Sequence, residues 1–410
     1  MAEKMETVLR RLEEEEGTPF YLLDLDKLGS RVDDLKSWMG GGIGLCFAIK
    51  SNPFLAAHLA RITDRLEVCS FGEYKICRTE GIAPEKLLIS GVLKKEKELE
   101  EILEECGGRR RYTVESPAQY EILARWSREH SCHLSVYPRL TSGNQFGMDQ
   151  ETVKKICLAA KEEPCLEISG IHFFSGTQKS RTKKLLGEVE KLDAFLQDLE
   201  RETGKVPELE FGTGMAFSYF QDQKPVGREF MEEVCGAIRS MQWSGHVTIE
   251  MGRAIAASCG CYVTKASDIK ESDGRAYCIV DGGIHQLHYD GQIRGMYHPF
   301  LKVLPAEGDF REPSGKTWTI CGSLCTVNDV LVAEQELGEL SLGDLLVFEN
   351  AGAYSMLEGM ALFLSHEIPG IAVYSREKGA RWLRRSQESW PMNCCRAEKE
   401  SLALDKSDHA

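Results

Sequence analysis

The chain has 410 residues and a mass of 46.0 kDa, which allows one large domain with a smaller one, or two to three ordinary domains. Its 50 Lys and Arg against 64 Asp and Glu leave a formal net charge of −14, which repels nucleic acid and anionic membrane surfaces and argues against both as partners. No window approaches the roughly 18 consecutive apolar residues of a membrane span, and the charged N-terminal segment shows no secretory signal. We therefore expect a cytoplasmic protein.

The 15 cysteines are an odd number, scattered along the chain without C-x-x-C pairs at zinc-site spacing. This pattern predicts a reduced compartment, no metal site, and thiols that mostly pack as small buried side chains. Cys325 differs from the others because it lies in a polar loop.

Short apolar runs rich in β-branched and aromatic residues alternate with longer amphipathic stretches, which is the pattern of βα units and a parallel sheet. The eight runs span residues 45–49, 66–69, 87–90, 111–115, 133–139, 166–173, 208–211 and 247–250. The helix-like stretches between them include 53–62, 95–106, 117–130, 151–161 and 183–203. Eight such units predict an α/β fold, a (β/α)8 TIM barrel, whose chemistry lies at the carboxyl ends of the strands.

The rhythm changes beyond about residue 260, where β-rich segments with turns predict a second, C-terminal all-β domain. An early run at 18–24 precedes the barrel and is expected to join that β domain. The predicted boundaries are an N-terminal segment at 1–25, the barrel at 26–260, the β domain at 261–378 and a polar C-terminal tail at 379–410.

Lys50 ends an apolar strand and is followed at once by Ser51-Asn52-Pro53, a turn signal. At a barrel mouth backed by an apolar wall we expect the amine to be partly desolvated, which lowers its pKa and makes it a nucleophile toward an aldehyde. The competing interpretation is a surface lysine that snorkels to solvent.

Two loops carry groups suited to a phosphate. Gly212-Thr213-Gly214 follows the seventh run, where glycines let backbone N–H groups approach an anion, and Arg253 after the eighth run adds a planar charged donor. The hydroxyl of Ser175 is expected to join them. By itself the glycine pair also fits a plain turn.

Glu250 and His172 end the eighth and sixth predicted strands. A carboxylate at that place can keep a pyridine nitrogen protonated and the ring a strong electron sink, and an imidazole can stack on a flat ring. A salt bridge to a nearby Arg and a structural histidine are the competing interpretations. In the β region, the stretch 322–329 places the thiol of Cys325 and the carboxylate of Asp329 in one loop, where a thiol can act as an acid or base.

Together these motifs resemble the fold-type III pyridoxal-phosphate decarboxylases, the group of the diaminopimelate and ornithine decarboxylases that is related to alanine racemase, over about residues 18–370. The stretch 47–52 is similar to the family's Schiff-base lysine motif, and 172–176 to its ring-stacking His and phosphate-binding Ser. The stretches 212–214 and 250–253 are similar to its phosphate loop and to the element that pairs the pyridine nitrogen and the phosphate. Residues 325–329 and 352–354 resemble segments that the family brings in from a second subunit.

The resemblance implies a decarboxylase with pyridoxal 5'-phosphate bound to Lys50 as an aldimine. The implied cofactor-binding residues are Lys50, His172, Ser175, Gly212, Thr213, Gly214, Glu250, Arg253 and Tyr354. The implied substrate-binding residues are Arg139, Cys325, Asp329 and Tyr354. Lys50, Glu250 and Cys325 are the implied catalytic residues: charge left by CO2 passes into a quinonoid ring, and Cys325 of a partner chain returns a proton to carbon. A homodimer with shared active sites follows.

Departures from the family pattern bear on the substrate. Met251 and Thr213 replace the usual Pro and Gly, and Thr326 stands after Cys325 where the relatives carry a carboxylate for the distal ammonium. The resemblance then favours a small-molecule amino acid that is conjugated or carrier-protein-bound. The alternatives are a diaminopimelate decarboxylase of lysine biosynthesis, a racemase, disfavoured because Glu250 strengthens the electron sink, and a non-catalytic regulator that binds the cofactor.

Overall fold

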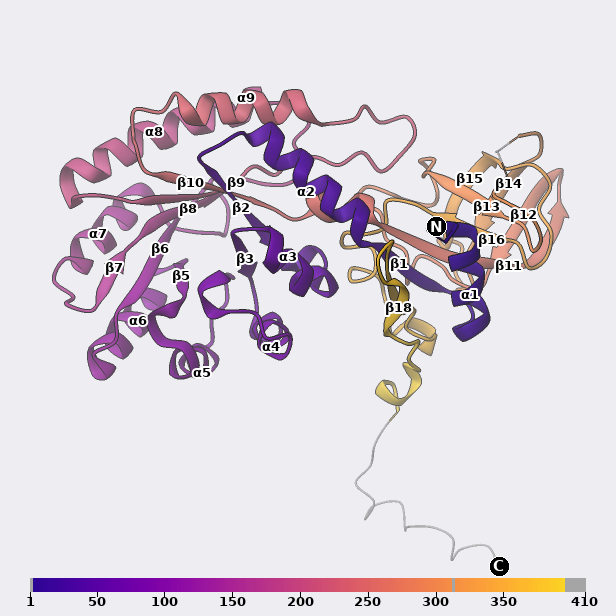
Figure 1. Cartoon of the computed structure of the whole chain (residues 1–410), viewed down its shortest axis with the longest axis horizontal. Helices are drawn as coiled ribbons and strands as arrows, with labels where there is room; N and C mark the ends of the chain where they lie inside the picture. The colour runs from indigo at the N-terminus through magenta and orange to yellow at the C-terminus, as the bar shows by residue number, and fades with distance from the viewer. Residues whose placement is uncertain (1–2, 312–313, 395–410) are drawn as a thin grey trace, which may run out of the picture. The chain divides into compact units, whose positions relative to one another are not determined.

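The computed structural model describes residues 3–311 and 314–394 and contains two compact units, which Figure 1 draws with their elements labelled. The barrel unit consists of Leu25–Cys259 with Gly352–Tyr354. The β unit consists of the described parts of 1–24, 260–351 and 355–410.

The barrel unit is a closed parallel barrel, so the predicted fold class is confirmed. Its strands are β2 (Ile43–Ala48), β3 (Arg65–Val68), β4 (Leu87–Ile89), β5 (Arg111–Val114), β6 (Leu134–Leu140), β7 (Leu166–Ile168), β8 (Gly170–Phe174), β9 (Glu208–Gly212) and β10 (His246–Met251). They follow the order β5-β4-β3-β2-β10-β9-β8-β6, and pairing of β5 with β6 closes the ring. The sixth predicted strand is interrupted at Ser169, so that β7 and β8 pair with successive parts of β6.

Helices connect the barrel strands in the order expected from the sequence. They are α2 (Leu25–Met39), α3 (Ala56–Ile62), α4 (Phe71–Thr79), α5 (Glu96–Cys106), α6 (Pro117–His130), α7 (Gln150–Ala160), α8 (Lys183–Thr203), α9 (Arg228–Arg239) and α10 (Arg253–Ala256), with 3-10 turns η1 (Ile49–Ser51), η2 (Pro53–Leu55), η3 (Pro84–Lys86), η4 (Gly107–Arg109) and η5 (Ala257–Cys259). Ser70, Ser116 and Asp149 cap α4, α6 and α7 by accepting from a backbone N–H three residues on. These caps start each helix at a defined residue of the rim.

The interior of the barrel is unusually polar for a buried core. Arg65 on β3 binds the carboxylates of Glu208 and Glu210 on β9, and the Tyr137 hydroxyl on β6 donates to Glu208 Oε2 at 2.7 Å. Since β3, β6 and β9 are not neighbours in the barrel, these side chains meet across its interior. Alternate residues of a strand share one face, so Glu67, two residues after Arg65, points into the same interior nearer the rim.

The β unit holds a mixed sheet and one packed helix. Its elements are α1 (Met5–Glu16), β1 (Phe20–Asp24), β11 (Gly260–Ser272), β12 (Arg275–Val280), β13 (Leu301–Leu304), β14 (Thr317–Cys321), β15 (Val330–Glu336), β16 (Leu345–Phe348), β17 (Gly370–Ser375), β18 (Gly379–Arg384), η6 (Phe363–Ser365) and η7 (Trp390–Met392). The strand order is β15-β14-β12-β11-β1-β17-β18, and β16 pairs with β11 and β13. Strand β1 runs antiparallel to β11 and parallel to β17.

Residues 379–384 form strand β18 instead of the start of the expected polar tail. The strand pairs with β17, and the Trp382 ring contacts Phe20 edge to face at 5.7 Å between centroids. Its alternation of half-buried and exposed residues is weak, which is why the sequence reads as polar and irregular. The rest of the predicted tail from 395 lies outside the described residues.

Within the described ranges, no helix combines the length and the apolar character needed to cross a bilayer.

Candidate active site

Lys50 lies at the rim of the barrel unit, in the turn η1 that follows strand β2. Its Nζ lies 2.8 Å from Glu67 Oε2 and 3.8 Å from Glu250 Oε1, carboxylates supplied by the two strands that flank β2. The Lys50 side chain is 37% exposed, whereas those of Glu67 and Glu250 are 3% and 5% exposed. The amine is therefore open to a ligand while its counter-ions are buried.

The pKa of Lys50 is raised, and the expectation of a lowered value is wrong. Burial by itself lowers this pKa, but attraction to Glu67, Cys69 and Glu250 outweighs burial and holds the pKa well above its usual value. The expected effect occurs instead at Lys94, where burial lowers the pKa to about 8. The Lys94 amine donates to three neutral oxygens: Gly91 O at 2.7 Å, and Thr113 Oγ1 and Gln119 Oε1 at 3.2 Å.

Glu250 also contacts His172, which the sequence assigns to the same site. His172 Nε2 lies 3.2 Å from Glu250 Oε2, and the imidazole is 1% exposed. Burial, reinforced by the Arg139 charge, lowers the pKa of His172 to about 3, so the ring is neutral at physiological pH. Nδ1 has no hydrogen-bond partner in the described part of the chain, which leaves one polar atom of a buried ring available to a ligand.

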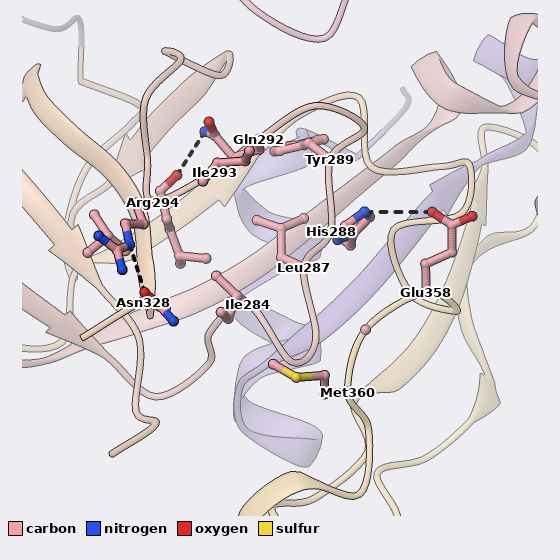
Figure 2. Close-up of a pocket in the computed structure, with 13 residues that line it drawn as sticks. Ile284, Leu287, His288, Tyr289, Gln292, Ile293, Arg294, Asn328, Glu358 and Met360 are labelled. Atoms are coloured by element: carbon pink, nitrogen blue, oxygen red, sulfur yellow. Dashed lines mark hydrogen bonds and ion pairs between the residues drawn. The ribbon is translucent and has the colours of Figure 1, made fainter. Parts of the chain in front are cut away.

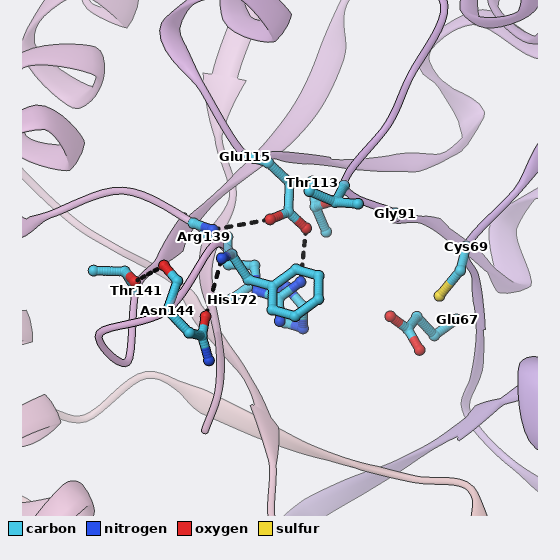
Figure 3. Close-up of polar contacts among 12 residues, drawn as sticks. Glu67, Cys69, Gly91, Thr113, Glu115, Arg139, Thr141, Asn144 and His172 are labelled. Carbon is cyan, nitrogen blue, oxygen red and sulfur yellow. Dashed lines mark hydrogen bonds and ion pairs between the residues drawn. The ribbon is translucent and has the colours of Figure 1, made fainter. Parts of the chain in front are cut away.

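Figure 3 shows Arg139, Glu115 and His172 gathered at the same rim of the barrel. Arg139 donates to Glu115 Oε1 at 2.7 Å and stacks over the Phe146 ring at 4.8 Å, while Glu115 Oε2 accepts from Gly147 N at 2.9 Å. Strand pairing places Arg139 opposite His172. Arg139, predicted to bind substrate, is thus buried and held by a carboxylate beside the histidine.

The glycine loop Gly212-Thr213-Gly214 after β9 is hydrogen-bonded to the loop that follows β8. Gly214 has φ +61°, and an added Cβ would lie 1.9 Å from Gly176 O, so only glycine fits here. Lys179 N donates to Gly214 O at 2.9 Å, and Ala216 N donates to Lys179 O at 3.1 Å. The backbone of Gly212-Thr213-Gly214 therefore has a defined shape, as a phosphate cradle requires.

Ser175 does not line this cradle. Its hydroxyl donates to Glu188 Oε2 at 2.6 Å and accepts from Lys179 Nζ, in a side-chain cluster of its own. Thr177, two residues on, is the hydroxyl-bearing residue that lines the pocket at Lys50. The sequence missed Thr177 because both residues lie in the same short polar loop, and alternation alone does not say which hydroxyl faces inward.

Arg253 lies next to the glycine loop, at the start of α10. Its Nη1 donates to the Tyr219 hydroxyl at 2.7 Å, and its guanidinium stacks on the Tyr354 ring at 4.6 Å from the centroid. Tyr354 adopts φ +64°, and its N donates to Ser51 O at 2.7 Å, next to Lys50. The pocket that these residues line has a volume of about 40 Å³. Its lining residues are Ala48, Lys50, Phe174, Thr177, Gly214, Met215, Glu250, Met251, Gly252, Arg253, Ala254 and Tyr354.

This donor set fits a phosphorylated pyridine aldehyde. The pocket offers an amine, a buried carboxylate, a guanidinium and a glycine-shaped backbone turn, and His172 Nδ1 is a buried polar atom without a described partner. Glu67, His172 and Glu250 also place ligand atoms within 4.8 Å of one another, as a metal site does. The Lys50 ammonium contacts both carboxylates, so a cation of the chain itself balances this group.

In the β unit, Cys325 is exposed on the loop between β14 and β15. Asp329 is 3% exposed and accepts from Ile284 N at 2.8 Å and Leu324 N at 2.7 Å. Burial raises the pKa of Asp329, although the two N–H donors oppose the rise. This carboxylate therefore holds the Cys325 loop in shape, and its two oxygens are engaged by backbone.

A cavity of about 680 Å³ in the β unit begins beside this loop (Figure 2). Its walls include Ile284, Leu287 and Met360, and its polar groups are Arg294, whose Nε donates to Asn328 Oδ1 at 2.7 Å, and a His288–Glu358 pair at 3.7 Å. Of these residues, only Asn328 lies in a motif that the sequence indicates, the stretch 325–329. No motif marks the other lining residues, because the segments 284–294, 330–331 and 358–360 are distant in sequence.

Comparisons with known proteins show the family of this chain. A family model described as pyridoxal-dependent decarboxylase, C-terminal sheet domain, matches residues 20–352. The chain is 27% identical to an L-glutamyl acyl-carrier-protein decarboxylase of Niallia circulans, over 95% of this chain and 96% of the relative, and 25% identical to the diaminopimelate decarboxylase of Aquifex aeolicus, over 93% and 92%. The solved structure of Helicobacter pylori diaminopimelate decarboxylase complexed with L-lysine superposes with a TM-score of 0.80 at 21% identity, covering 94% of this chain and 99% of that one. The chain therefore belongs to the family of pyridoxal-dependent decarboxylases.

Proposed function

We propose that this pyridoxal-dependent decarboxylase acts on an amino acid conjugated through its side chain, as a cytoplasmic homodimer with shared active sites. The observation that carries the chemistry is the Lys50 amine, held 2.8 Å and 3.8 Å from two buried carboxylates at the rim of a barrel. An amine in that position can react with a carbonyl group of a cofactor. The buried carboxylate of Glu250 can pair with a protonated ring nitrogen.

When bound, pyridoxal 5'-phosphate supplies an aldehyde for the substrate amine and a ring that accepts the electron pair left at Cα when CO2 departs. Lys50 offers its Nζ to the aldehyde once the proton it shares with Glu67 has moved to that carboxylate or to solvent. Glu250 would accept a proton-bearing nitrogen of the cofactor, while His172 Nε2 holds its Oε2 at 3.2 Å. Thr177, Gly214 and Arg253, which line the pocket, would bind the phosphate oxygens.

Cys325 is proposed to donate the proton that replaces CO2, from the partner subunit's loop. Its exposure, and the anchoring of the loop by Asp329, suit a thiol that must reach a site outside its own unit. Exposed apolar side chains at Leu357, Met360 and Phe363, which are 43%, 49% and 42% exposed, support a face that is covered in an assembly.

The substrate class rests on the loop and the cavity of the β unit. Thr326 follows Cys325 and offers no charge to a distal ammonium. The cavity beside the loop has apolar walls at Ile284, Leu287 and Met360, which suit a neutral, elongated group. The Niallia circulans relative, whose printed name is that of a carrier-protein-linked glutamyl decarboxylase, supports a conjugate, whereas the Aquifex aeolicus relative supports diaminopimelate as the second candidate.

A substrate panel tests the substrate class. CO2 release is measured from meso-diaminopimelate, ornithine, lysine, glutamate and a glutamyl thioester of pantetheine. We expect kcat/KM for the thioester to exceed that for each free amino acid by at least about 100-fold, or roughly 3 kcal/mol. A preference for meso-diaminopimelate, with lysine as product, overturns the proposal in favour of the second candidate.

Lys50→Ala tests the reaction chemistry, with Lys94→Met as the matched control. We expect the first variant to lose turnover and the absorbance band of the bound cofactor, and the second to keep both, because Lys94 does not line the pocket. If the Lys50 variant keeps the band and the Lys94 variant loses it, the nucleophile is Lys94.

Mixing two inactive variants tests the shared site. In a mixed dimer of Lys50→Ala and Cys325→Ala, one of the two sites carries neither change, so random exchange restores about a quarter of the activity. Refolding the two together is the measurement, and each variant refolded alone is the control. If the mixture stays inactive although mixed dimers have formed, Lys50 and Cys325 of one chain contribute to the same site.

A further inference from the structure

Beneath the pocket, one guanidinium is shared by two carboxylates of the same strand. Arg65 Nη1 lies 2.8 Å from Glu210 Oε2, and Arg65 Nη2 contacts Glu208 Oε2. The Glu208 side chain is 23% exposed and receives the Tyr137 hydroxyl, but the Glu210 side chain is 0% exposed. Glu210 Oε1 has no hydrogen-bond partner among the residues that the structure describes.

Charge counting shows that the two carboxylates differ in protonation. A single guanidinium neutralises one carboxylate, and a second buried negative charge without its own partner is costly. For Glu208, burial is outweighed by the Tyr137 hydroxyl and by Arg65, so its pKa is lowered. For Glu210, burial, with repulsion from Glu250, outweighs Arg65 and raises the pKa to about 8. Glu210 is the member of the pair that holds a proton near neutral pH.

Glu210 lies directly below the groups that face the cofactor pocket. In the strand pairing it stands opposite His172 on β8 and Thr248 on β10. Glu250 is two residues after Thr248, on the same face of β10. Two other strands also place polar groups against Glu210: Arg65 of β3 and the Cys46 thiol of β2. Glu208, on the same strand as Glu210, binds the same guanidinium.

We propose that Glu210 stores a proton in the cofactor-free enzyme and releases it to solvent when the cofactor binds, because binding places a protonated ring nitrogen beside Glu250. The O–H bond of Glu210 breaks and its proton passes to solvent, while Glu250 stays a carboxylate and the cofactor keeps the ring proton that it brings. The charge inside the barrel is unchanged, because the new ring cation is matched by the new Glu210 anion. This inference rests on the proposed contact between the ring nitrogen and Glu250.

Calorimetric titration of the cofactor-free enzyme with pyridoxal 5'-phosphate tests the proton count. The titration is run at pH 7 in two buffers of different ionisation enthalpy, which yields the protons exchanged per site. In Glu210→Gln the amide keeps an oxygen for Arg65 but holds no exchangeable acid proton. We expect this variant to take up about one more proton per site than the wild type. A difference of at least about half a proton supports the proposal. The control, Glu163→Gln, changes a carboxylate that pairs with Arg128 and does not line the pocket, and should exchange the wild-type number.

The titration distinguishes failure of the role given to Glu210 from failure of the proposed function. Equal proton counts in the wild type and Glu210→Gln, with normal cofactor binding in both, overturn the role of Glu210 and leave the proposed function standing. Failure of the wild type to bind the cofactor overturns the proposed function itself. If Glu210→Gln does not fold, the infrared difference spectrum of the wild type decides: cofactor binding should remove a protonated-carboxyl C=O band, and a spectrum without that loss refutes the inference.

Discussion

Lys50 Nζ and Glu67 Oε2 lie 2.8 Å apart, so the amine that must capture an aldehyde is held as an ammonium ion by a buried carboxylate. The ion pair orients the side chain but also keeps on it the proton that blocks nucleophilic attack. The ion pair therefore places the amine accurately but slows its reaction with the cofactor aldehyde.

Glu67→Gln should speed capture of the cofactor near neutral pH. Without the carboxylate, burial is opposed by fewer attractive charges and the pKa of Lys50 falls. Each unit of pKa lost raises the neutral fraction about tenfold. The rise of the cofactor absorbance band after rapid mixing, followed against pH, measures the effect. Glu73→Gln, which changes the carboxylate that accepts from Cys69 N, is the control, and an unchanged pH profile in Glu67→Gln contradicts the role given to Glu67.

Arg253→Lys should weaken cofactor binding at least about tenfold. Lysine keeps the charge but loses the planar fork that donates to Tyr219 and stacks on Tyr354. The dissociation constant is obtained by titration of the cofactor-free enzyme. Tyr219→Phe removes one hydroxyl and keeps both rings, so a smaller loss is expected there. Equal affinity in wild type and Arg253→Lys means that the guanidinium does not hold the phosphate.

The stability of the cofactor-free enzyme should fall as pH rises from about 4.5 to 8, relative to that of Glu210→Gln. The pKa of Glu210 is raised from 4.5 to about 8, so within this window the native state holds a proton that the unfolded state has lost. Stability then decreases with rising pH, and above about pH 8 the contribution no longer changes. Urea unfolding at several pH values measures it. Parallel curves for the two proteins refute the assignment of the proton to Glu210.

Trp382→Ala should destabilise the β unit by about 2–3 kcal/mol, because a half-buried ring that meets Phe20 at 5.7 Å is removed. Leu383→Ala, at the neighbouring position that is 37% exposed, is expected to lose less than about 1 kcal/mol. Denaturant unfolding compares them. If both variants lose the same small amount, β18 does not belong to the folded sheet and the polar tail begins near residue 379 after all.

Much of the barrel can be predicted from sequence because its signals are local. Eight apolar runs, the helical stretches between them and the caps at Ser70, Ser116 and Asp149 depend on residues a few positions apart. The motifs at Lys50 and Gly212-Thr213-Gly214 were found for the same reason. The interruption at Ser169 was missed, since β7 and β8 form one continuous apolar run in the sequence.

The sequence by itself determined the order of strands and helices, the glycine turn and the chemical types at the strand ends. Only the tertiary structure decided that Glu67 holds Lys50, that Thr177 lines the pocket in place of Ser175, and that Arg65 joins Glu208 and Glu210 from about 145 residues away. Local conformation follows from neighbours along the chain, through sterics and short hydrogen bonds. The charge state of a side chain follows from distance in space and from burial, and closure of the barrel sets both.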